Sequence, residues 1–137
     1  MKSVSDKIPS LKELDLLAER LTAGGVNDQG QIDFCWLIRQ ACGRPRMYVG
    51  KQSFELLATF LDGYDHALNR GQARPRSWGL SEFGHWLVPQ LNLSSSPGWR
   101  QMMMKSFPDE TEAFAQLPHL YEEFLLHQAK TLANKKT

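Results

Sequence analysis

The sequence is short of the features that usually reveal a binding site or a compartment. Lys and Arg number 16 and Asp and Glu 15, so the formal net charge is only +1. A chain so close to neutral lacks the overall positive field that favours nucleic acid or anionic membranes, and any charge argument must be local. No apolar run approaches the roughly 20 residues needed to span a bilayer, and the polar residues 1–7 lack the pattern of a signal peptide. These absences predict a cytoplasmic protein that does not bind a membrane.

Cysteine is also scarce. The two cysteines, Cys35 and Cys42, fall in one predicted helix, where two turns separate them by about 10 Å along the axis. A disulfide needs Cα atoms within roughly 7 Å, so these residues are not expected to bridge. Neither cysteine forms, with His66 or His85, the C-x-x-C or H-x-x-x-H spacing of a zinc site. We therefore expect two buried, reduced cysteines, and neither a metal nor a cofactor.

What the sequence does contain is helical periodicity along nearly its whole length. Of its 137 residues, 42% are hydrophobic, which is enough for one domain to bury a core without disulfides or metal. Apolar residues recur at three- and four-residue intervals, and no segment shows the alternation of a strand. We expect a single all-α domain over residues 1–137, bundle-like, with about five to seven helices, in which residues 1–8 and 130–137 fray.

Capping residues, glycines and prolines mark the ends of the predicted helices. The helices are expected over residues 11–23, 32–42, 53–70, 78–91, 97–106 and 109–128. Gly43 is expected to end the second helix at its C′ position. Ser96 and Pro97 fit the N-cap and the first residue of the fifth helix.

Two prolines fall inside predicted helices, where proline removes a backbone hydrogen bond and usually kinks the chain. Pro89 predicts that the fourth helix bends or ends near Val88. Pro118 predicts either a kink in the last helix or a break after Leu117.

Residues suited to catalysis are present but form no recognisable set. The four histidines, at positions 66, 85, 119 and 127, have no sequence-local partner for acid–base or nucleophilic chemistry. Asp62 and Asp65 lie three residues apart on a predicted helix, and such pairs usually belong to a solvated surface. We therefore expect no enzymatic activity; a small enzyme would need a pocket that gathers His66 or His85 with carboxylates.

Charge is unevenly distributed along the chain. The stretch 39–76 contains Arg39, Arg44, Arg46, Lys51, Arg70, Arg74 and Arg76. The stretch 106–127 contains Asp109, Glu110, Glu112, Glu122 and Glu123 and neither Lys nor Arg. These groups could attract each other within the monomer, which is the simpler interpretation, or either could dock a partner. The basic stretch keeps a small helical DNA-binding regulator as an alternative, although the loops lack helix-turn-helix spacing and nucleic acid is not the favoured partner.

The most distinctive segment is the R-P-x-M-Y-x-G sequence at 44–50, followed by Ser53 and a helix that contains F-L-D-G-Y. Its members are Arg44, Pro45, Met47, Tyr48, Gly50, Ser53, Phe60, Leu61, Gly63 and Tyr64. This pattern resembles small all-helical immunity proteins of bacterial polymorphic toxin systems. We expect the segment to have a structural role, as a loop that Pro45 stiffens and in which Gly50 allows the backbone to turn. Met47 and Tyr48 are expected to pack between helices, and Ser53 to cap the next helix.

The resemblance implies a non-enzymatic inhibitor that binds the C-terminal domain of a cognate toxin and blocks its active site or substrate groove. Contacts with the toxin are then expected outside the motif, among charged residues of loops and helix ends. If the toxin is a nuclease with a basic groove, charge complementarity favours the acidic group as the contact surface. Its members are Asp109, Glu110, Glu112, Glu122 and Glu123.

Overall fold

A computed structural model describes residues 29–70 and 79–135 of the chain. In these two ranges the chain forms six α-helices and no strand, which confirms the all-α prediction. The helices are α2 (Gln29–Gly43), α3 (Pro45–Val49), α4 (Phe54–Arg70), α5 (Leu80–Gln90), α6 (Trp99–Ser106) and α7 (Glu110–Lys135). The helix predicted over residues 11–23 lies outside the described residues.

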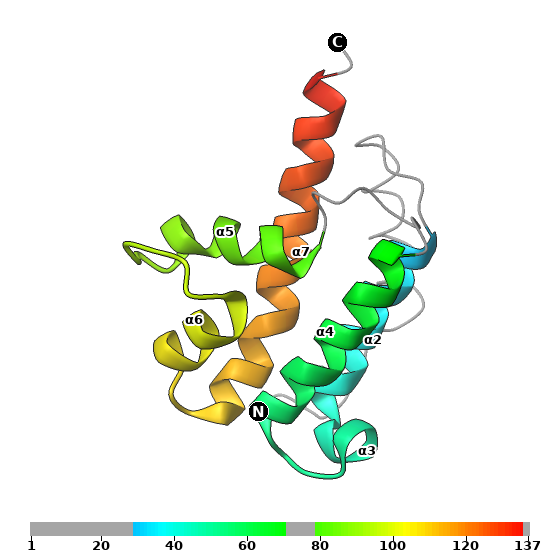
Figure 1. Cartoon of the computed structure of the whole chain (residues 1–137), viewed down its shortest axis with the longest axis vertical. Helices are drawn as coiled ribbons and strands as arrows, with labels where there is room; N and C mark the ends of the chain where they lie inside the picture. The colour runs from blue at the N-terminus through cyan, green and yellow to red at the C-terminus, as the bar shows by residue number, and fades with distance from the viewer. Residues whose placement is uncertain (1–28, 71–78, 136–137) are drawn as a thin grey trace, which may run out of the picture.

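The longest helix, α7, is the element on which the others are arranged. It runs along the long axis of the molecule, with α2 and α4 side by side on one side and α5 and α6 on the other (Figure 1). Each of these four helices contacts α7, and α3 packs on α2 and α4 at one end. This arrangement places the starts of α4 and α7 at the same end of the bundle (Figure 1).

Aromatic side chains dominate the core between these helices. Phe34, Phe54, Phe83, Tyr121 and Phe124 are each at most 1% exposed, and they come from four different helices. Several of their rings contact one another edge-on, with Phe83 and Tyr121 at a centroid distance of 5.3 Å. Such contacts add to the free energy of burial, so this cluster fixes how the helices meet.

The start of α4 is fixed by two different oxygen acceptors. The Oγ of Ser53 accepts a hydrogen bond from the backbone N–H of Leu56 at 3.2 Å, so Ser53 is the predicted N-cap. The carboxylate of Glu110, at the start of α7, accepts a bond from the N–H of Phe54 at 2.9 Å. A helix begins with four unpaired N–H groups, and here one acceptor is local while the other comes from a distant part of the chain.

The segment expected to be a loop between α2 and α4 is instead the short helix α3. Pro45 occupies its first turn, where a missing N–H costs nothing, and Gly50 ends it in a left-handed conformation with φ of 81°. Gly50 thus provides the predicted turn. Gly43, by contrast, is the last residue of α2 rather than its C′ residue, because α2 reaches Gly43 and the N–H of Arg44 still bonds to the Gln40 carbonyl at 3.0 Å.

The two prolines within predicted helices have different outcomes. Pro89 is the penultimate residue of α5, which ends at Gln90 as the sequence predicts. Pro118 lies inside α7, which continues without a break to Lys135, so the predicted alternative of a break after Leu117 is wrong. Core residues lie on both sides of Pro118, among them Phe114 and Tyr121.

The start of α6 differs from the prediction. The helix begins at Trp99 with Gly98 as its N-cap, and Gly98 has a φ of 124° that strongly favours glycine. Ser96 and Pro97 therefore precede the helix and do not cap it. The later start places the Trp99 side chain inside the bundle, where it is 6% exposed.

Both cysteines are buried in α2 and neither forms a disulfide, as the sequence predicts. Burial in an apolar environment raises the pKa of the Cys42 thiol, so it stays protonated and unreactive at neutral pH. We expect thiol reagents at pH 8 to modify the folded protein at least about 100-fold more slowly than the protein in denaturant. The measurement is the rate of thiolate release from a disulfide reagent; equal rates in the two conditions would contradict the burial of the cysteines.

Candidate functional site

The five acidic residues predicted to contact a partner do not form one free surface. Glu122 is half-buried and forms an ion pair with Arg39. One of the contacts in this pair, from Nη2 of Arg39 to Oε1 of Glu122, measures 3.4 Å. This pair links α7 to α2, which is the attraction between the two charged stretches that the sequence suggested as the simpler interpretation. Glu110 is engaged at the start of α4 through its bond to Phe54.

The other three predicted acidic residues, Asp109, Glu112 and Glu123, are exposed. Asp109 also caps α7, because its Oδ1 accepts a bond from the N–H of Thr111 at 3.0 Å. Glu112 accepts a bond from Nε2 of Gln116 at 2.8 Å, on the solvent side of the helix. Glu112 and Glu123 are eleven residues apart, which places them on the same side of α7 about 16 Å from each other.

The residues of the R-P-x-M-Y-x-G motif divide into an inner and an outer set. Pro45 is buried, and the ring of Tyr48 lies 6.0 Å from that of Phe60 in α4. Met47 does not pack between helices as the sequence predicted, because it is 73% exposed. In the folded helix, positions 45, 48 and 49 share the inner face, and position 47 lies outside it.

The second half of the motif lies on α4. Tyr64 stacks on Phe34 of α2, with ring centroids 5.3 Å apart and planes within 3°. This contact connects the two helices on either side of α3. A Cβ added to Gly63 would meet no atom within 4 Å, so nothing in the structure explains the glycine at that position.

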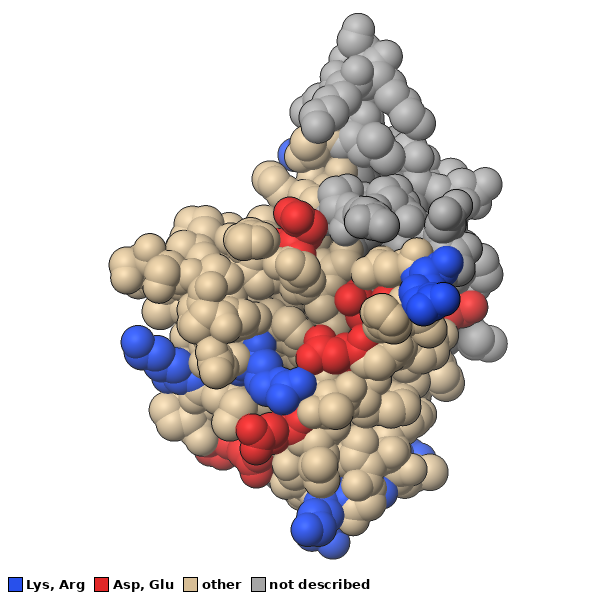
Figure 2. Space-filling view, viewed as in Figure 1, with Lys and Arg blue, Asp and Glu red and all other residues tan. Residues whose placement is uncertain are grey.

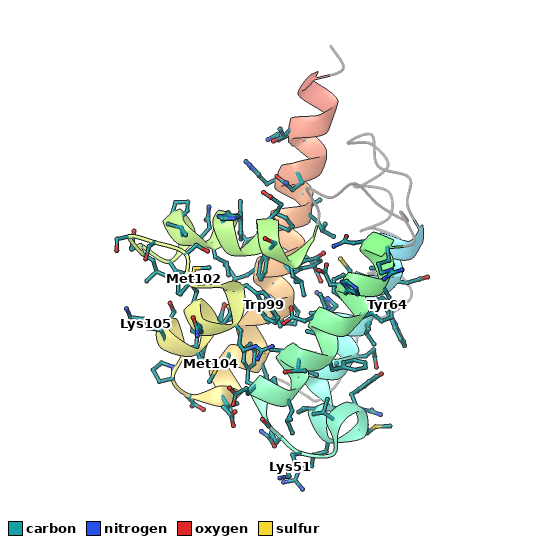
Figure 3. The ribbon with its side chains drawn as sticks, viewed as in Figure 1. Lys51, Tyr64, Trp99, Met102, Met104 and Lys105 are labelled. Carbon is teal, nitrogen blue, oxygen red and sulfur yellow. The ribbon has the colours of Figure 1, made fainter. Side chains whose placement is uncertain are left out.

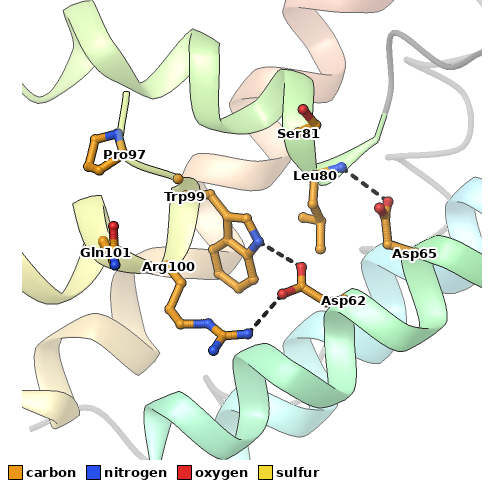
Figure 4. Close-up of a pocket in the computed structure, with 9 residues that line it drawn as sticks. Asp62, Asp65, Leu80, Ser81, Pro97, Trp99, Arg100 and Gln101 are labelled. Carbon is orange, nitrogen blue, oxygen red and sulfur yellow. Dashed lines mark hydrogen bonds and ion pairs between the residues drawn. The ribbon is translucent and has the colours of Figure 1, made fainter. Parts of the chain in front are cut away.

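A shallow groove of about 410 Å³ lies between α4 and the starts of α5 and α6 (Figure 4). The carboxylate of Asp62 accepts bonds from Trp99 Nε1 and Arg100 Nη2, both at 2.9 Å. Asp65, one turn further along, is buried and accepts a bond from the N–H of Leu80 at 3.1 Å. The interpretation of Asp62 and Asp65 as a solvated pair is therefore wrong, because they connect α4 to the beginnings of α5 and α6.

The groove is lined by the carboxylates of Asp62 and Asp65 but by no histidine. Neither His66 nor His85 is among its lining residues, and all four histidines are exposed. Within the two described ranges, no group of three or more His, Cys, Asp or Glu side chains could hold a metal ion. Likewise, no helix in these ranges is long and apolar enough to cross a membrane.

The basic residues that the sequence singled out have separate environments. Arg39 is paired with Glu122, whereas Arg44, Arg46, Lys51 and Arg70 are exposed. Arg74 and Arg76 lie outside the described residues.

Comparison of the chain with protein-family models, curated proteins and solved structures found no match.

Proposed function

We propose that this chain is an immunity protein that binds the C-terminal domain of a cognate bacterial toxin and covers its active site or substrate groove. The observation that carries the proposal is the motif by which the chain resembles such proteins. Its residues work together as a brace for α2, α3 and α4: Pro45 is buried, Ser53 caps α4, and Tyr64 stacks on Phe34. An inhibitor that acts by covering a site needs such a rigid scaffold, because preorganisation reduces the entropic cost of binding.

The exposed acidic residues of α7 are the part of this scaffold that fits a basic groove. Glu110 and Glu122 already form bonds within the domain. The residues proposed to contact the toxin domain are therefore Asp109, Glu112 and Glu123. Their spread of about 21 Å along α7 is within the span of a standard protein interface. Complementary charge at such an interface speeds association and selects the partner.

The direct test is co-expression with the toxin domain encoded by the neighbouring gene. We expect a stable one-to-one complex in size-exclusion chromatography with light scattering, and restored growth of cells that express the toxin domain. An isolated gene, or failure to rescue growth from any adjacent toxin domain, would overturn the proposal.

A charge-reversal variant tests the contact surface. Replacing both Glu112→Lys and Glu123→Lys should slow association with the toxin domain about tenfold at low salt and less at high salt, because charges at an interface act mainly on the association rate. Surface plasmon resonance at two salt concentrations gives this rate. The matched control is Glu82→Lys, an exposed glutamate on α5, which should leave the rate unchanged. Equal association rates for the double variant and the control would show that Glu112 and Glu123 of α7 do not lie in the interface.

A small helical DNA-binding regulator is the second candidate, and one observation favours it: Arg44, Arg46, Lys51 and Arg70 are all exposed. This function predicts salt-sensitive retention on duplex DNA, which is lost when Arg70, Arg74 and Arg76 are replaced by alanine. Retention that does not depend on these arginines would contradict it.

A further inference from the structure

One end of the bundle, which we name the basic tip, combines three exposed cations with one exposed apolar side chain. It consists of Arg44, Arg46, Met47 and Lys51, from α3 and the turns that flank it. Met47 is 73% exposed, whereas the other exposed large apolar residues in the described ranges are 36% to 43% exposed. Nη1 of Arg44 lies 4.0 Å from the Met47 sulfur, so the methionine is bordered by charge.

The local fold explains why these four side chains face outwards. Pro45 is buried, and Tyr48 and Val49 pack against the core, so they occupy the inner side of the single turn of α3. Arg44, Arg46 and Met47 are left on the outer side. Gly50 then reverses the chain in a left-handed conformation, and Lys51 precedes the start of α4.

The basic tip adjoins carboxylates from another helix. The bond between Glu110 and the N–H of Phe54 brings the start of α7 to the start of α4, three residues after Lys51. Asp109, Glu110 and Glu112 therefore lie at the same end of the bundle as the tip, and Figure 2 shows both positive and negative atoms at this lower end. A phosphate backbone laid across this end would meet both signs of charge, which disfavours nucleic acid as the ligand.

The composition of the tip is that of a protein interface. Arginine and methionine are enriched at such interfaces, and methionine adapts its shape to irregular apolar surfaces. An exposed methionine alone would be unremarkable on a soluble protein. Its position among three cations, beside a group of carboxylates, fits a partner surface that is acidic around an apolar contact and basic next to it.

We propose that the basic tip docks onto an acidic protein surface of the toxin domain, with Met47 as the central apolar contact. This inference rests on the proposed function and extends it, because it adds the motif itself to the contact surface. The neighbouring acidic residues then face the basic groove of the toxin domain, while the tip engages an acidic area beside that groove. This end of the bundle thus binds a partner surface that has an acidic area next to a basic one. It discriminates against proteins whose surface carries only one of these charges.

The experiment measures binding of the toxin domain to full-length variants by isothermal titration calorimetry. We expect Met47→Ala to raise Kd about tenfold and the double variant Arg46→Glu, Lys51→Glu to raise it about 100-fold. The matched controls are Met104→Ala and Lys105→Glu, an exposed methionine and lysine on α6, away from the tip (Figure 3). These controls should change Kd less than twofold, and all variants should keep the thermal unfolding curve of the wild type because the altered side chains are exposed.

Each outcome decides between the proposals. If the wild type binds the toxin domain and the tip variants bind as tightly as the controls, the tip proposal is overturned while the proposed function stands. If the wild type does not bind, both are overturned. If the tip variants lose retention on duplex DNA and keep their affinity for the toxin domain, the tip is a nucleic-acid surface and the proposal for a protein partner is wrong. If a toxin-domain variant with an acid-to-lysine change binds the Arg46→Glu, Lys51→Glu variant as tightly as the wild-type pair binds, the tip lies in the interface.

Discussion

Replacing Phe83 by alanine is expected to lower the free energy of unfolding by about 3–5 kcal/mol, because the change removes a fully buried ring and leaves a cavity. Phe83 is 0% exposed, and its ring lies 5.3 Å from that of Tyr121 and 5.5 Å from that of Phe124. It also approaches Trp86 and Trp99, both at 6.2 Å. The side chain therefore connects α5 to both α6 and α7, and a domain of this size has only about 5–15 kcal/mol of stability to lose.

Equilibrium unfolding in urea, followed by circular dichroism at 222 nm, measures this loss. The control is Phe60→Ala, because Phe60 is half-buried at the edge of the core, where its ring faces Tyr48. We expect the control to lose about half as much free energy, in proportion to the apolar area buried. A loss for Phe60→Ala equal to that for Phe83→Ala would show that the core is not centred on α5, α6 and α7.

Sequence periodicity predicted the longer helices because each of them buries one continuous stripe. The stripe of α4, with Leu57, Leu61 and Ala58 buried, is an example. The start of this helix was also predictable, since Ser53 caps it through a bond within its own first turn. Local signals of this kind depend only on residues close in sequence.

Features set by distant residues were not predictable in this way. The start of α6 is one example: Ser96 and Pro97 fit a capping pattern, yet the helix begins at Trp99, whose Nε1 donates to Asp62 of α4. The close approach of α5 and α6 is another, because a Cβ on Gly84 would lie 3.2 Å from the backbone nitrogen of Trp99. Tertiary contacts of this type override local propensity, and one sequence alone does not reveal them.

The acidic residues of the candidate site also divide into those that the nearby sequence explains and those that distant residues determine. The exposed positions of Asp109, Glu112 and Glu123 agree with their place at the start and on the solvent side of a helix. By contrast, Glu110 bonds to Phe54, which is 56 positions away in the chain, and Glu122 pairs with Arg39, which is 83 positions away. A five-residue helix such as α3 is too short for a periodic pattern to reveal, so the exposure of Met47 was mispredicted.

Replacing Asp65 by alanine is expected to lower the free energy of unfolding by about 2–3 kcal/mol, because it leaves the buried N–H of Leu80 without its carboxylate acceptor. Leu80 is the first residue of α5, and its N-cap, Gly79, has no side chain to cap the helix. Asp65 supplies that cap from α4, and its negative charge also suits the N-terminus of a helix. Urea unfolding measures the loss, and faster amide hydrogen exchange at Leu80 locates it.

Two variants separate the hydrogen bond from the charge and from the general effect of a change on α4. Asp65→Asn keeps an oxygen acceptor but removes the charge, so it should lose less free energy than Asp65→Ala. His66→Ala changes the next, exposed residue and should stay within about 0.5 kcal/mol of the wild type. If Asp65→Ala matched His66→Ala in stability and in the exchange rate of the Leu80 amide, the carboxylate would not cap α5. The order Ala, Asn, wild type in increasing stability would instead show that a residue on α4 sets where α5 begins, and with it one wall of the groove.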